Sequence, residues 1–103
     1  MSEDVALALD LFGPLGAVRT RRMFGALGVY RDDAMFALIH RGVVHVRARE
    51  ALARRFEAAG AKPFTYERDG RTVALGYWSL PESALDDPDE ALDWAREALA
   101  QAR

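Results

Sequence analysis

The 103-residue sequence contains no cysteine and only one lysine, and no apolar run approaches the ~18 residues of a membrane-spanning helix. Without cysteine, the chain cannot form a disulfide, a thiolate nucleophile or a zinc–thiolate site. Because no signal-like leader is present either, we expect a soluble, cytoplasmic protein. A chain of this length buries one modest core, which predicts a single domain over residues 1–103.

Net charge is also small, at −2, but it is unevenly distributed. Residues 19–55 hold nine arginines against three acids, a balance of +6. Residues 82–97 hold seven acids against one arginine, a balance of −6. Such polarity steers partners more than it stabilises a fold, and it is equally compatible with two regions that face each other across a dimer.

Three helices are predicted from apolar spacing and capping residues. Glu3–Phe12 repeats apolar residues on one face, with Ser2 as its N-cap. Arg49–Ala59 lacks a capping side chain at its start, so we expect its first turn to fray. The last helix opens where Asp87 can cap and Glu90 can close a capping box.

Six strands are predicted between these helices, from β-branched and alternating segments separated by turn residues. They are Val18–Phe24, Leu27–Arg31, Ala34–His40, Val43–Arg47, Phe64–Arg68 and Arg71–Leu80. Asp69-Gly70 is the strongest short-range hairpin signal in the chain. Strands and helices together predict an α+β fold.

Two-residue turns at Asp32-Asp33 and Arg41-Gly42 would sort the first four strands into two faces. The predicted core face carries Tyr30, Met35, Ala37, Ile39, Val44 and Val46. The other carries Leu27, Val29, Arg31, Phe36, Leu38, His40, Val43, His45 and Arg47. This second face is too apolar for open water, so we expect an interface built on Leu27, Val29, Phe36, Leu38, His45 and Arg47. A terminal helix could also cover it.

One ten-residue segment combines two cations, a large apolar pair and two glycines: Arg21-Arg22-Met23-Phe24-Gly25-Ala26-Leu27-Gly28-Val29-Tyr30. It predicts two strands that meet at a tight corner, where glycine permits positive φ or close backbone approach. The candidate interaction residues of this signature are Arg21, Arg22, Met23, Phe24, Gly25, Gly28 and Tyr30.

The segment resembles the signature of the TfoX/Sxy N-terminal domain, the family named for regulators of bacterial natural competence. Later blocks match in order, namely Met35-Phe36-Ala37-Leu38, Gly42–Arg47, Phe56-Glu57-Ala58-Ala59-Gly60, Pro63-Phe64-Thr65-Tyr66-Glu67, Gly70, Gly76-Tyr77-Trp78-Ser79-Leu80-Pro81, and Asp87-Pro88 followed by Leu92 and Trp94. Ala26 stands where the family usually has a second glycine, and Gly76 where it usually has proline.

The resemblance implies a two-layer fold in which one antiparallel sheet of five to six strands packs with an N-terminal, a middle and a C-terminal helix. It also implies a regulator of transcription or competence that works with the cyclic-AMP receptor protein. Full-length members carry a further helical domain to which nothing here corresponds, so we expect a stand-alone domain. We therefore expect function through protein–protein contacts, including a possible homodimer.

Residues that could support catalysis or metal binding occur where structural roles explain them. His40 and His45 share a predicted face but have no third ligand on it, so we expect no metal site. Asp32-Asp33 and Asp86-Asp87 fall in a turn and before a helix, where Asp is favoured for local hydrogen bonds. We expect neither an enzyme nor a cofactor.

Direct nucleic-acid binding by the basic region Arg19–Arg55 is the alternative function. Arginines interleaved with Phe24 and Tyr30 could contact phosphates and stack on bases. Arg19 and Arg21 share one face of the first strand and Arg22 lies on the other, and the whole chain is acidic. We therefore rank DNA binding below protein contact.

Overall fold

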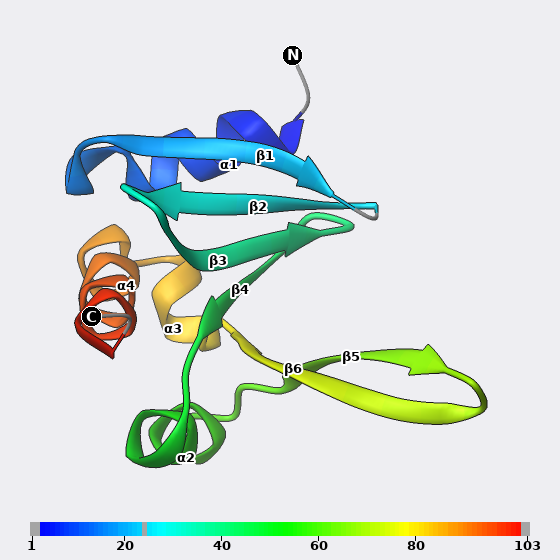
Figure 1. The fold of residues 1–103 in the computed structure, drawn as a ribbon. Helices are drawn as coiled ribbons and strands as arrows, with labels where there is room; N and C mark the ends of the chain where they lie inside the picture. Colours follow the sequence, from blue (N-terminus) through cyan, green and yellow to red (C-terminus); the bar gives the residue numbers. More distant parts are fainter. Residues whose placement is uncertain (1–2, 24, 102–103) are drawn as a thin grey trace.

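The computed structural model describes residues 3–23 and 25–101, and within them six strands form one antiparallel sheet in the order β1-β2-β3-β4-β6-β5 (Figure 1). The helices are α1 (Glu3–Phe12), the 3-10 turn η1 (Gly13–Leu15), α2 (Glu50–Ala58), α3 (Glu82–Leu85) and α4 (Pro88–Gln101). The strands are β1 (Val18–Met23), β2 (Ala26–Arg31), β3 (Ala34–His40), β4 (Val43–Arg47), β5 (Pro63–Arg68) and β6 (Arg71–Ser79). The predicted α+β fold is confirmed. Ser2 and Phe24 lie outside the described residues.

The helices form a layer on one face of the sheet. Helix α1 contacts β1 and β2, α4 contacts β3 and β4, and α2 contacts β6. Phe12 of α1, Phe56 of α2 and Leu99 of α4 belong to one buried cluster. The sheet residues of that cluster are Leu27, Val29, Phe36, Ala37, Ile39, Val44 and Val46. The core therefore lies between this face and the helices.

A β-bulge in β3 corrects the predicted division of the sheet into faces. Tyr30 pairs with Met35, but Val29 pairs with Ala37, so Phe36 is an extra residue on β3. The prediction that Leu27, Val29 and Phe36 face away from the core is wrong: all three are buried in it, at no more than 1% exposed. Tyr30 and Met35 lie on the opposite face instead.

The start of α2 is held by the end of α4. Arg49 has no side-chain cap, as predicted, but the Gln101 side chain pairs with its backbone. Gln101 Oε1 accepts from the Arg49 N–H at 3.2 Å, and Gln101 Nε2 donates to the Arg49 carbonyl at 3.0 Å. The Arg49 guanidinium also donates to the Gln101 carbonyl at 2.7 Å. A residue 52 positions away therefore supplies what the local sequence lacks.

The start of α4 is capped from within its own segment. Asp87 Oδ1 accepts from the N–H groups of Asp89 and Glu90 at 3.1 and 3.3 Å, which confirms the predicted cap. The Glu90 carboxylate does not close a capping box. It accepts instead from Ser83 Oγ at 2.8 Å and from Trp94 Nε1 at 3.0 Å, so it joins α3 to α4.

The acidic and basic regions meet in part within the chain. Arg55 of α2 donates to Glu97 of α4 at 2.5 Å, and its guanidinium lies 5.3 Å from the centre of the Trp94 ring. Hydrogen bonding to the Glu97 carboxylate raises the pKa of Arg55. The ion pair between the basic region and the acidic region therefore joins α2 to α4.

Candidate binding surfaces on the sheet and its hairpin

The face of the sheet opposite the helix layer carries side chains from β1, β2, β3, β4 and β6. Directly paired antiparallel residues share a face, and the register pairs Arg19 with Tyr30, Tyr30 with Met35, and Arg47 with Tyr77. Leu38 is 3% exposed yet lies outside the helix-side cluster. We call this surface the open sheet face. Its residues are Arg19, Arg21, Met23, Gly28, Tyr30, Met35, Leu38, His40, Val43, His45, Arg47, Tyr77 and Ser79.

The open sheet face is cationic. None of its described strand residues is an aspartate or glutamate, whereas Arg19, Arg21 and Arg47 are all exposed. Arg19 contacts the acidic β2–β3 turn: it donates to the Asp32 carbonyl at 2.7 Å and lies 3.9 Å from the Asp33 carboxylate. Arg21 and Arg47 have no ion-pair partner among the described residues. The acids of the chain are concentrated elsewhere.

Glycine is required at two positions of the signature for different structural reasons. A Cβ on Gly28 would lie 3.0 Å from Tyr30 Cε1, 3.1 Å from Met23 Sδ and 3.3 Å from Met35 Sδ. Because glycine stands there, these three side chains can lie flat on the sheet. Gly25 has φ of +79°, which confirms the predicted positive φ, and no described atom would lie within 4 Å of its Cβ.

Phe64 of β5 packs between the two histidines. Its ring centre lies 5.3 Å from that of His40 and 5.1 Å from that of His45, both edge-on. Burial lowers the pKa of His45; a hydrogen bond with the Val43 carbonyl opposes this shift, and the neighbouring His40 adds to it. Among the described residues, no three His, Cys, Asp or Glu side chains gather closely enough to hold a metal ion.

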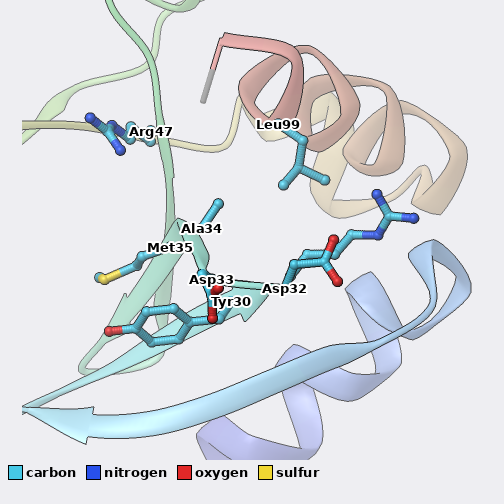
Figure 2. Close-up of a pocket in the computed structure, with 8 residues that line it drawn as sticks. Tyr30, Asp32, Asp33, Ala34, Met35, Arg47 and Leu99 are labelled. Atoms are coloured by element: carbon cyan, nitrogen blue, oxygen red, sulfur yellow. The ribbon is translucent and has the colours of Figure 1, made fainter. Parts of the chain in front are cut away.

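An open groove of 640 Å³ lies at the edge of the open sheet face, where the start of β3 lies beside the end of β4, and it reaches α4 of the helix layer. Figure 2 shows Tyr30 and Met35 on one side, with Arg47 and Leu99 of α4 across from them. Asp32 and Asp33 lie at its rim. The Tyr77 hydroxyl donates to the Met35 carbonyl at 3.3 Å, and burial raises the pKa of that hydroxyl.

The β5–β6 hairpin projects away from the helices in Figure 1. We call residues 65–75 the hairpin arm. Tyr66 pairs with Val73, and Leu75 lies two residues further along β6, so the three share one face of the arm. Tyr66 and Leu75 are 36% and 47% exposed. On the other face, Thr72 Oγ1 donates to Glu67 Oε1 at 2.9 Å.

The structure thus divides the predicted site residues among four places. Leu38, His45 and Arg47 lie on the open sheet face, together with Arg21, Met23, Gly28 and Tyr30. Leu27, Val29 and Phe36 belong to the core, and Gly25 lies in the β1–β2 turn. Arg22 pairs with Leu27 and therefore lies on the helix side.

Sequence reasoning did not place Met35 and Tyr77 on the open sheet face, nor Phe64 against its two histidines. One signal could have found Tyr77: it adjoins Trp78, and Trp78 pairs with the core residue Val46. Strand alternation then places Tyr77 on the opposite face.

One antiparallel sheet of six strands, packed with an N-terminal, a middle and a C-terminal helix, is the arrangement that the resemblance implied. The chain belongs to the TfoX N-terminal domain family, whose model matches residues 10–102. It is 30% identical over 89 residues to the DNA transformation protein TfoX1 of Aliivibrio fischeri, a match that covers 86% of this chain and 43% of that protein. It is 33% identical over 74 residues to Protein Sxy of Escherichia coli, a match that covers 72% of this chain and 35% of that protein.

The chain thus spans less than half the length of both relatives. None of the described helices combines the length and the apolar character needed to cross a membrane.

Proposed function

We propose that this domain is a non-enzymatic regulator of DNA transformation and of the transcription that competence requires, and that it acts by contacting another protein. Support for the biological setting comes from family membership and from a relative named a DNA transformation protein. Support for a contact role comes from surfaces that the fold leaves apolar and uncovered. The proposal does not require any catalytic group.

The hairpin arm is the observation that carries the proposal. A two-stranded hairpin without a packed layer is marginally stable in water. Tyr66 and Leu75 nevertheless expose large apolar side chains on one face of it. Clustered apolar exposure of this kind marks protein interfaces, because hydrating the side chains costs free energy that a partner would remove.

The partner that the family resemblance suggests is the cyclic-AMP receptor protein. We expect Leu75→Glu to weaken binding of that protein by about tenfold or more, as for a central apolar contact. Ala74→Glu is the matched control, since Ala74 is exposed on the other face of the same strand. Isothermal titration with the receptor protein of the same organism measures both variants.

Sedimentation velocity of the chain alone tests a second copy as the occupant of the hairpin arm. If the wild-type chain is a dimer that Leu75→Glu dissociates and Ala74→Glu preserves, the partner of the hairpin arm is a second copy of the chain and not the receptor protein. If the wild-type chain is a monomer and both variants bind the receptor protein with wild-type affinity, the proposed role of the arm is contradicted.

The alternative, nucleic-acid binding by the whole basic region, has less support. Its arginines are spread over several surfaces: Arg41 lies in the β3–β4 turn, and Arg54 and Arg55 lie on α2. Arg55 is already paired with Glu97. A single continuous basic track along Arg19–Arg55 is therefore not formed.

A further inference from the structure

We propose that the open sheet face binds single-stranded nucleic acid, with phosphates held by Arg21 and Arg47 and bases stacked on Tyr30 and Tyr77. This goes beyond the protein contact assigned to the hairpin arm and uses a different surface. The proposal rests on three features of the face: the order of its side chains, its charge, and the groove at its edge.

The side chains follow one another across the sheet in a regular order. Arg19 pairs with Tyr30, Tyr30 pairs with Met35, and the Tyr77 hydroxyl reaches the Met35 carbonyl. Arg47 lies between, paired with Tyr77. Five adjacent strands at about 4.8 Å spacing make this row roughly 19 Å long. Two arginines and two tyrosines stand along it, with Met35 between Tyr30 and Arg47, which suits a strand that presents both phosphates and bases.

The charge of the face favours phosphate. Arg21 and Arg47 have no ion-pair partner among the described residues, and no described strand position of the face carries a carboxylate. Arg19 is partly committed to the β2–β3 turn. The chain's overall net charge of −2 does not describe this surface, because seven acids lie in residues 82–97. Arginine held near phosphate releases counterions and drives binding.

The aromatic rings are held ready for stacking. Tyr30 lies over Gly28, and its hydroxyl contacts Met23 Sδ at 3.9 Å. Tyr77 is tethered to Met35 and remains only half-buried. A fixed, partly exposed ring gains stacking with little loss of side-chain freedom. Paired bases inside a duplex cannot reach these rings, so the expected ligand is single-stranded.

The groove between Met35 and Arg47 gives room for one unstacked base beside the row. Its 640 Å³ falls in the range of small-ligand pockets, about 300–1,000 Å³. Asp32 and Asp33 at the rim repel phosphate and can accept hydrogen bonds from base amino groups. The base rather than the backbone would therefore enter.

Fluorescence anisotropy with labelled twenty-nucleotide oligo(dT), oligo(U) and a mixed-sequence duplex tests the proposal. We expect the single strands to bind tighter than the duplex, with affinity that falls as salt rises. Tyr30→Ser should weaken oligo(dT) binding about fivefold or more, while Tyr30→Phe, which keeps the ring, should bind as wild type does. Arg21→Ala combined with Arg47→Ala should reduce the magnitude of the salt slope by about 1.4.

Arg54→Ala is the matched control, because Arg54 is an exposed arginine on α2, away from the face; it should change binding less than about twofold. Binding of either oligonucleotide supports the proposal, and the tighter one identifies DNA or RNA. Circular dichroism confirms that each variant is folded. Absence of binding at about 50 mM salt, or equal binding of duplex and single strand, would overturn the proposal. If poly-L-glutamate displaces the oligonucleotide and Tyr30→Ser does not change oligonucleotide affinity, the face would bind an acidic protein instead.

Discussion

The Phe12 ring packs edge-on against the Phe36 ring, with centroids 5.2 Å apart and planes at 80°. Phe12 ends α1, and Phe36 is the extra residue of the β3 bulge. The bulge turns Phe36 toward the helices, and α1 covers it there. This contact therefore joins the helix layer to the sheet at the point where the register of the sheet changes.

Phe36→Ala should lower the free energy of unfolding by about 3–5 kcal/mol, because it removes a fully buried ring and leaves a cavity beside Phe12. Urea unfolding measures the loss. Val43→Ala is the control: Val43 is 48% exposed on a strand of the same sheet and should lose well under ~1 kcal/mol. Similar losses for the two variants would show that Phe36 does not anchor the helix layer.

Most of the fold could be predicted from local sequence because turn residues separate its elements. The predicted and observed bounds of β3 and β4 agree, and Asp69-Gly70 forms the expected turn. The bulge could not be predicted in this way. Both alternations of β3 are apolar, so Phe36 and Leu38 fit either face, and packing between the sheet and the helices decides which of them enters the core.

The candidate surfaces were harder to predict from the sequence, because they depend on the register between β2 and β3. Because of the one-residue bulge, Tyr30 and Met35 lie on the open sheet face, where Leu27 and Val29 had been predicted. The contact of Gln101 with Arg49 is also invisible locally, since it joins residues 52 apart. Short-range signals predicted the elements, whereas long-range packing determined which side chains are exposed.

Gly25→Val should destabilise the protein by about 1–3 kcal/mol. The cause is backbone strain alone: Gly25 has φ of +79°, and no described atom would clash with a new Cβ. Thermal melts test this against Gly25→Asn, since asparagine tolerates positive φ better than a β-branched residue. Equal melting temperatures for wild type and Gly25→Val would mean that this glycine is incidental to the turn.

Gln101→Ala should free the first turn of α2. It removes two hydrogen bonds to the Arg49 backbone, worth about 1 kcal/mol together because the site is exposed. Amide hydrogen exchange should become faster in residues 49–53, while the middle of β3 keeps its protection. Gln101→Glu is the matched variant, because it retains the acceptor and loses the donor, and it should give an intermediate effect. Unchanged exchange in both variants would leave the start of α2 without an identified support.

His45 should make the protein less stable as the solution becomes acidic. Its pKa in the folded state is held below 6.5, first by burial and then by His40, against the opposing Val43 carbonyl. Phe64 packs on the same ring, and Ser79 is its cross-strand partner. The unfolded chain therefore binds a proton more readily than the folded chain as pH falls through this range.

Stability linked to His45 is thus fully present above pH 6.5 and is lost as pH falls through the lowered folded pKa. Urea unfolding from about pH 8 to about pH 5 should show this loss in the wild type. His45→Gln should remove that part of the pH dependence, because glutamine does not titrate. His40→Gln is the control and should retain it, since the burial of His45 remains. The same pH profile for wild type and His45→Gln would show that another group dominates acid sensitivity.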